Sequence, residues 1–269
     1  MRYKVLKITA TFSFLIFIGN VNVAFAEENL NCLFSKEAIL HDECIDVRVT
    51  FNKLSRNSKP LPKKEREELF AKLIQDLEKI KDYSSITSYL VLVSQSAYYL
   101  KQYDLAESRA LASLGYSHKS ENPDATHMAW AILTGVYAVQ KNINLSRDAL
   151  RKAQKGLLCE SKPGVCAYVL KEKGTLEIAS QNYEIANSDL DRAASMFQER
   201  AEYYKAGLIY YTAAEFLATR SAENAILNYN KAKDMYCLTG QVGVCKIYSE
   251  MTASKIQKLV NNRGHNNDK

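Results

Sequence analysis

Glycine and proline, the two residues that most disturb a helix, are scarce in this chain. It has 10 Gly and 4 Pro among 269 residues. In a helix interior they are less favourable than alanine by about 1 and 3 kcal/mol, so their scarcity favours a mostly helical chain. Beyond the first 26 residues, no apolar run approaches the roughly 20 residues that a membrane span requires. We therefore expect no stable membrane span in the mature protein.

Catalytic and metal-binding motifs are also absent. The sequence contains no H-E-x-x-H, no G-x-S-x-G, no P-loop and no glycine-rich nucleotide fingerprint. No acidic pair stands out for acid–base chemistry; Glu172, for example, stands between Lys171 and Lys173, as is typical of a solvated helix face. The four histidines are scattered, at His41, His118, His127 and His265. We predict a protein that is not an enzyme and that uses no cofactor and no metal.

The N-terminus has the three parts of a secretory signal. Arg2, Lys4 and Lys7 form a basic start, Phe12 to Ile18 an apolar run, and Ala24-Phe25-Ala26 a small-x-small cleavage site. A membrane anchor is the alternative, but the apolar run is too short to span about 30 Å of hydrocarbon. Residues 1–26 are therefore predicted to be a signal peptide. We expect a periplasmic protein, with secretion to the exterior as the alternative.

The charge balance gives little support to nucleic-acid binding. Removing the predicted signal lowers the number of basic residues from 36 to 33, against 30 acidic residues, so the net charge falls from +6 to +3. Nucleic-acid binding relies on clustered Lys and Arg that neutralise phosphates, whereas this mild excess is spread along the chain. We predict that the partner is not a nucleic acid.

Small residues recur at a spacing of about forty residues. The four copies start at Leu90, Trp130, Leu170 and Ile209. Four residues later stand Ser94, Thr134, Gly174 and Ala213, and sixteen residues after each start stand Ala106, Ser146, Ala186 and Ala225. A fixed period in this range is typical of helical hairpins that stack on one another. Small residues suit the points at which two helices cross closely.

The pattern inside each copy resembles the tetratricopeptide repeat (TPR), in which W-x2-L-G-x2-Y is followed by Ala, an aromatic residue or Leu, and Ala. Trp130, Leu133 and Tyr137 match the first helix, Gly174 matches the family glycine, and Ala186, Leu190 and Ala193 match the second helix. Lys173 and Thr212 depart from the family leucine, and Glu177 departs from its aromatic residue. The period near forty exceeds the usual 34 or so and is similar to the long-helix variety typified by kinesin light chains.

The resemblance, which covers roughly residues 84 to 240, implies an all-α protein. We expect a right-handed α-solenoid of about four TPR-like hairpins plus flanking helices. The predicted divisions are a disulfide-tied N-terminal segment at residues 27–61, one solenoid at 62–260 and a disordered tail at 261–269. A closing helix from Val244 to Val260 is expected to turn its apolar residues inward, namely Ile247, Met251, Ile256 and Val260.

Six cysteines remain after signal removal, and an oxidising compartment favours disulfides. Of the fifteen possible connectivities, the repeat favours one. Cys159 and Cys166 bracket a turn between two hairpins, and Cys237 and Cys245 bracket the corresponding turn two repeats later. Cys32 and Cys44 are left to tie down the N-terminal segment. Zinc is the rival interpretation, but the spacings exceed C-x2-C and no His stands at ligand spacing.

The resemblance also implies a binding groove, because in the family the first helices line the concave face. Carried onto this sequence, the candidate partner-binding residues are Gln95, Tyr98, Met128, Tyr168, Lys171, Thr175 and Tyr210. Tyrosine offers a large apolar body with a polar tip, which suits peptide or protein binding. The alternative is that these tyrosines simply fill space between helices.

These observations predict a non-catalytic periplasmic protein that binds or scaffolds a peptide or protein partner in a concave groove. The alternative is a sensor or accessory module that takes a small ligand or a signal peptide.

Overall fold

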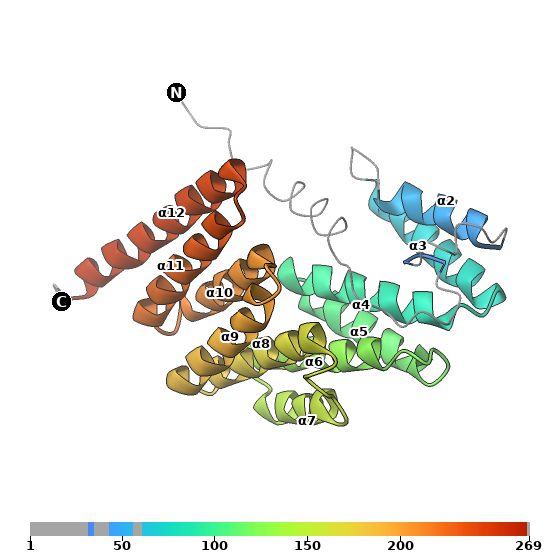
Figure 1. Ribbon diagram of the computed structural model, residues 1–269, viewed down its shortest axis with the longest axis horizontal. Coiled ribbons are helices and arrows are strands. Elements are labelled where there is room, and N and C mark those ends of the chain that lie inside the picture. The colour runs from blue at the N-terminus through green and yellow to red at the C-terminus, as the bar shows by residue number, and fades with distance from the viewer. Residues whose placement is uncertain (1–31, 35–42, 56–60, 268–269) are drawn as a thin grey trace. The chain divides into compact units, whose positions relative to one another are not determined.

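The computed structural model describes residues 32–34, 43–55 and 61–267, and within them it contains eleven helices and no strand (Figure 1). The helices are α2 Glu43–Ser55, α3 Lys63–Lys79, α4 Tyr83–Tyr99, α5 Tyr103–Ser117, α6 Pro123–Val139, α7 Ile143–Gln154, α8 Pro163–Ala179, α9 Tyr183–Gln198, α10 Tyr203–Leu217, α11 Ala222–Leu238 and α12 Val242–Asn267. The all-α prediction is confirmed for this part of the chain. The predicted signal peptide lies outside the described residues.

Contacts divide the chain into two compact units rather than the one stack predicted for residues 62–260. Unit 1 comprises Met1–Leu100 and Asp104–Thr126, and unit 2 comprises Lys101–Tyr103 and His127–Lys269. The boundary falls inside α6. A division of this kind is physically reasonable, because each hairpin in a repeat array contacts only its neighbours and no single core unites the chain.

The two helices of a hairpin cross at the recurring small residues. In the first copy the Ser94 hydroxyl donates to the Ala106 carbonyl oxygen at 2.6 Å, and in the second the Ser146 hydroxyl donates to the Thr134 carbonyl oxygen at 2.8 Å. In the third, a Cβ added to Gly174 would lie 3.3 Å from a carbonyl oxygen of α9. Backbones this close leave no room for a large side chain. The small residues that recur in each copy therefore mark real helix crossings.

The turns follow one plan at intervals of about twenty residues. Residues with a left-handed backbone follow the helix ends at Lys81, Lys101, Lys141, Gln181 and Ala201, and Glu121 has the same conformation in the longer turn before α6. At one such turn the Lys141 N–H donates to the Ala138 carbonyl at 3.0 Å, and the Asn142 N–H donates to the Tyr137 carbonyl at 2.8 Å. This pair of bonds is the Schellman motif, which satisfies the last carbonyls of a helix. The Asn142 side chain then caps α7, so only three residues separate the end of α6 from the start of α7.

Three disulfides join the cysteines in the predicted pairs, Cys32–Cys44, Cys159–Cys166 and Cys237–Cys245. The second bond ties the segment after α7 to the first turn of α8, and the third ties α11 to the first turn of α12. Both therefore hold a second helix to the first helix of the next hairpin.

The Cys32 segment is fastened to unit 1 by hydrogen bonds as well as by its disulfide. Its N–H donates to Asp82 Oδ2 at 2.7 Å, and its carbonyl accepts from Arg48 Nε at 2.7 Å. The other oxygen of Asp82 accepts from the Ser85 N–H at 2.9 Å and so caps α4. Burial raises the pKa of the Asp82 carboxyl, while these hydrogen bonds act in the opposite direction. One buried carboxyl group thus anchors both the N-terminal segment and the start of α4.

The residues that depart from the tetratricopeptide pattern form hydrogen bonds or ion pairs within their own hairpin. Lys173, at the family leucine position, pairs with Asp189 of α9 at 2.9 Å. Glu177, at the family aromatic position, accepts from the Asn182 side chain at 2.7 Å across the turn. The Thr212 hydroxyl donates to a carbonyl of the preceding turn of α10 at 2.9 Å. Polar pairs therefore replace apolar contacts at these positions.

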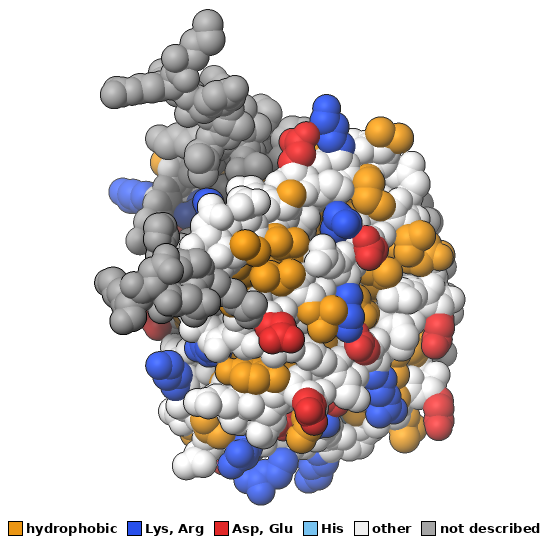
Figure 2. Space-filling model, turned by 90° about the vertical axis from the view of Figure 1, so that its left-hand side faces the viewer, with side chains coloured by type: hydrophobic (Ala, Val, Ile, Leu, Met, Phe, Trp, Pro, Cys, Tyr) orange, Lys and Arg blue, Asp and Glu red, His pale blue; other side chains and the backbone are white. Residues whose placement is uncertain are grey.

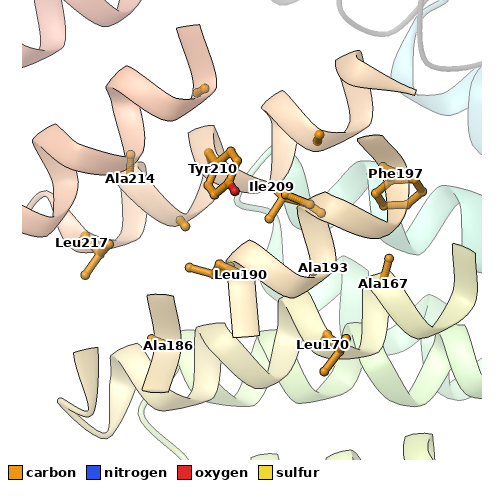
Figure 3. Close-up of a cluster of buried hydrophobic side chains, with 14 of the residues drawn as sticks. Ala167, Leu170, Ala186, Leu190, Ala193, Phe197, Ile209, Tyr210, Ala214 and Leu217 are labelled. Atoms are coloured by element: carbon orange, nitrogen blue, oxygen red, sulfur yellow. The ribbon is translucent and has the colours of Figure 1, made fainter. Parts of the chain in front are cut away.

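The largest part of the unit 2 core joins α8, α9 and α10 (Figure 3). Leu190 and Phe197 of α9 belong to one buried cluster with Leu170 of α8 and Ile209 of α10. Alanines between them let the helices approach closely. The residues that recur at the forty-residue period thus include both the small side chains at the helix crossings and the large side chains that fill this core.

The predicted orientation of the last helix is wrong at two positions. Ile247 and Val260 of α12 are 53% and 48% exposed, whereas Tyr248 packs against α10 and α11 and Thr252 is buried. α12 has apolar residues around much of its circumference, and the Tyr248 ring, stacked 3.6 Å from the Tyr236 ring, selects which side is buried.

On the side of unit 2 where α11 and α12 lie, the outward hydrophobic side chains form separate patches between charged ones (Figure 2).

The prediction of a disordered tail at 261–269 is also wrong for residues 261–267. α12 continues through Asn267. Once a helix is nucleated by packed turns, each further residue adds a hydrogen bond, and this does not require an apolar side chain.

Candidate interaction surface

The residues predicted to line a groove are mostly buried. Tyr168 is partly exposed, and the other six are at most 9% exposed: Gln95, Tyr98, Met128, Lys171, Thr175 and Tyr210. Gln95 and Tyr98 belong to unit 1, and the remaining five belong to unit 2. In this structure their side chains contribute to packing more than to an open surface.

Tyr210 illustrates the difference between expectation and structure. Its hydroxyl donates to Asp191 Oδ1 of α9 at 2.9 Å, and Lys231 Nζ of α11 lies 2.6 Å from the same oxygen. The Lys231 ammonium also lies 5.3 Å from the centre of the Tyr210 ring. Burial and the hydrogen bond to Asp191 raise the pKa of Tyr210. The side chain therefore links three helices, because its position on α10 points it between α9 and α11.

Lys171 and Thr175 occupy the buried side of α8. The Lys171 ammonium lies 2.5 Å from Glu172 Oε1, and the two side chains are 3% and 4% exposed. The Thr175 hydroxyl donates to the Lys171 carbonyl at 3.2 Å. Buried charges are rarely found without a partner, because removing one from water carries a large desolvation cost. A ligand reaching Lys171 would thus have to compete with Glu172.

Consecutive second helices of unit 2 are joined by an asparagine network that sequence reasoning missed. Asn187 of α9 donates to the side-chain oxygen of Asn224 of α11 at 2.9 Å and accepts from the Asn228 amide at 3.1 Å. Asn228 is fully buried and donates to the Asn224 carbonyl as well. The sequence offered one signal for this network, namely that Asn224 and Asn228 stand four residues apart and so lie on the same face of α11. This network fixes the register between neighbouring hairpins.

Tyrosines join α10, α11 and α12 in the same unit. The rings of Tyr204 and Tyr211 lie edge-on to that of Tyr248, at 6.1 and 6.2 Å, and the Tyr204 and Tyr248 hydroxyls are 2.9 Å apart. Aromatic pairs in this arrangement stabilise beyond the area that they bury. Here the tyrosines fill space between helices.

Glu215 of α10 is the charged centre of this region. It accepts hydrogen bonds from the Tyr229 hydroxyl and from Lys255 Nζ, the latter at 2.7 Å. Burial alone would raise the pKa of Glu215, but the hydrogen bonds and the charges of Lys255 and Lys101 outweigh burial and lower it. Ionised Glu215 therefore connects first helices of consecutive hairpins, α10 and α12.

Exposed apolar residues occupy one repeated place on the second helices. Leu105 of α5, Leu145 of α7 and Ile185 of α9 are 38%, 45% and 50% exposed and stand forty residues apart. Each immediately precedes a buried small residue of the helix crossing. In α11 this place holds Asn224, and the exposed apolar residue, Leu227, comes one turn later at 44%. Leu105 belongs to unit 1, and we call the three residues of unit 2, Leu145, Ile185 and Leu227, the second-helix column.

The second-helix column is the repeated feature whose side chains a partner could reach. Single exposed apolar residues are ordinary on protein surfaces, but Leu145 and Ile185 stand at an equivalent place in successive hairpins. Sequence reasoning overlooked it because apolar residues beside a buried column are readily taken for core.

Groups that could hold a metal ion are not found among the described residues. No set of three or more His, Cys, Asp and Glu side chains comes together in residues 32–34, 43–55 and 61–267. His127 has a structural contact instead, because its Nδ1 lies 2.8 Å from the Ala153 carbonyl of α7. The helices in these ranges also include none whose length and apolar character would let it cross a bilayer.

Comparison with protein-family models, with curated proteins and with solved structures finds no significant match to this chain. The three disulfides fit an exported protein.

Proposed function

We propose that this protein is a non-catalytic binding or scaffolding protein of the periplasm. In this proposal its TPR-like hairpins form a right-handed solenoid that holds a peptide or protein partner. The recurring helix crossings and the repeated Schellman turns support a hairpin array. The asparagine network between α9 and α11, and the Glu215–Lys255 ion pair between α10 and α12, support the stacking of successive hairpins.

The observation that carries the proposal is the second-helix column. Each hairpin of unit 2 offers a partner one accessible apolar side chain, at 44% to 50% exposure. Apolar anchors at regular intervals suit an extended or helical segment that crosses several hairpins, because each anchor adds area removed from water. We therefore place the partner on the second helices rather than on the first-helix residues that the family resemblance favours.

Site-specific photocrosslinking in the native cell envelope tests this placement. A photoreactive residue at Leu145 or Ile185 should give adducts with one partner. The same residue at Arg147 or Ser188, exposed polar positions on the same helices, should give none. Introducing Leu145→Glu should greatly weaken the adduct formed from Ile185, because a partner that spans both hairpins would lose an apolar contact.

A third probe position separates this placement from the groove. An adduct formed from Tyr168 but not from Leu145 or Ile185 would assign binding to the first helices and overturn our choice of surface. Absence of partner adducts at all three positions, with the protein correctly exported, would contradict the binding function itself.

A further inference from the structure

The three disulfides differ in how far solvent can reach them. Cys32 and Cys44 are 0% and 1% exposed; in the second bond Cys166 is 3% exposed and its partner Cys159 is partly exposed. Both cysteines of the third bond, Cys237 and Cys245, are partly exposed. A reductant must approach a disulfide sulfur directly, so access contributes to the rate of reduction. Cys237–Cys245 is therefore the one disulfide of the three in which solvent reaches both cysteines.

The surroundings of this bond also favour its opening. Cys245 lies in the first turn of α12, where the helix N-terminus stabilises a thiolate. The Ser249 hydroxyl lies 3.7 Å from Cys237 Sγ and 4.0 Å from Cys245 Sγ, close enough to donate to whichever sulfur is released. A stabilised leaving thiolate departs faster in thiol–disulfide exchange.

We propose that Cys237–Cys245 is a reducible latch that holds the terminal helix α12 on unit 2. The reductant is an external dithiol. One of its thiolates attacks a sulfur of the bond and forms a mixed disulfide, and the other cysteine leaves as a thiolate. The second thiol of the reductant then displaces the protein sulfur. The protein gains two thiols, and the dithiol is oxidised to its own disulfide.

The latch matters more for α12 than the equivalent bond does for α8. α8 packs against α7, α9 and α10, whereas α12 is the last described helix and packs against α11 and the tyrosines of α10. Cys159–Cys166 holds the start of α8 in the same way, yet Cys166 lies within the core. The two bonds thus form a matched pair that differs in accessibility and in the number of helices around the helix that they hold.

Timed reduction of the intact oxidised mature protein tests the order of opening. The protein is exposed to dithiothreitol, free thiols are trapped by alkylation at intervals, and the modified cysteines are identified by peptide mapping. We expect Cys237 and Cys245 to be modified first. Ser249→Ala should slow their modification and leave the rate at Cys159 and Cys166 unchanged. Opening of either other disulfide before or together with this bond would overturn the proposal.

Hydrogen exchange tests the consequence for α12. On selective reduction, amides of α12 should exchange about tenfold faster or more, because the loss of a short cross-link favours local opening. The paired replacement of Cys237 and Cys245 by serine should reproduce this change without a reductant. The same replacement at Cys159 and Cys166 should leave α8 exchange nearly unchanged. If exchange in α12 were equal in the oxidised and reduced protein, the bond would not be a latch.

Discussion

Gly174 gives the sharpest test of the helix crossing, because the effect of one methyl group can be worked out from the structure. A Cβ at this position would lie 2.9 Å from Leu190 Cγ, 3.1 Å from Leu190 Cδ2 and 3.3 Å from the Ala186 carbonyl oxygen. The first distance is shorter than atoms tolerate without movement. Leu190 is 1% exposed and lies in the core, so it has little space into which to move.

Two opposing effects decide the outcome of Gly174→Ala. Alanine is favoured over glycine inside a helix by about 1 kcal/mol. Overpacking a filled core costs about 1–3 kcal/mol. We therefore expect the free energy of unfolding to stay level or fall by up to about 2 kcal/mol. Larger residues at Gly174 should destabilise more.

Gly115 of α5 provides the control. It lies within a helix, and a Cβ there would meet nothing within 4 Å. Gly115→Ala should therefore stabilise by up to about 1 kcal/mol, and the two variants should differ by about 1–3 kcal/mol in urea denaturation followed by circular dichroism. Equal stabilisation by both substitutions would refute the close crossing of α8 and α9.

Three further predictions concern a turn, a titrating group and an ion pair. Lys141 has a φ of 62°, a left-handed conformation that glycine adopts without strain. Lys141→Gly should therefore stabilise the folded protein by about 0.5–1 kcal/mol in thermal denaturation, while Lys141→Ala has little effect. Equal effects of the two substitutions would contradict the left-handed turn. The pKa of Glu215 is lowered in the folded state. The stability that its ionised carboxylate contributes is therefore present above the unfolded pKa of 4.5 and is lost as pH falls through the folded pKa. Glu215→Gln should then cost about 1–2 kcal/mol at pH 7 and progressively less below about pH 4.5; a pH-independent loss measured by urea titration would exclude this assignment. Lys173→Leu should destabilise by about 1–3 kcal/mol because it leaves Asp189 poorly solvated and unpaired, and adding Asp189→Ala should recover most of the loss in a double-mutant cycle.

Local features of the fold were readable from the sequence because they depend on nearest neighbours. The small residues at Ser94, Thr134 and Gly174 predict helix crossings, since only a small side chain permits close approach. The cysteine spacing at each inter-hairpin turn predicts the disulfides, since a short loop holds two cysteines within bonding reach. These features require only the chain direction and the helical period.

The candidate surface was only partly predictable. Family resemblance led to Lys171 and Tyr210, but a helix of mixed composition can be rotated by tens of degrees without violating its pattern. That rotation decides whether Tyr210 meets solvent or Asp191, and it depends on which residues the neighbouring helices present. The exposed column at Leu145 and Ile185 was missed for the same reason, since apolar character alone does not state which side is covered.

The amino-acid sequence by itself determined the helical class, the forty-residue hairpin period and the cysteine pairs, because each follows from residue type at short spacing. Tertiary packing alone decided the rotation of α12, which buries Tyr248 and leaves Ile247 exposed. Tertiary packing also decided that Lys173 pairs with Asp189, and that Cys237–Cys245 is accessible while Cys166 is buried in the core. These outcomes depend on contacts between helices, where small differences in packing energy choose among orientations that the local pattern allows equally.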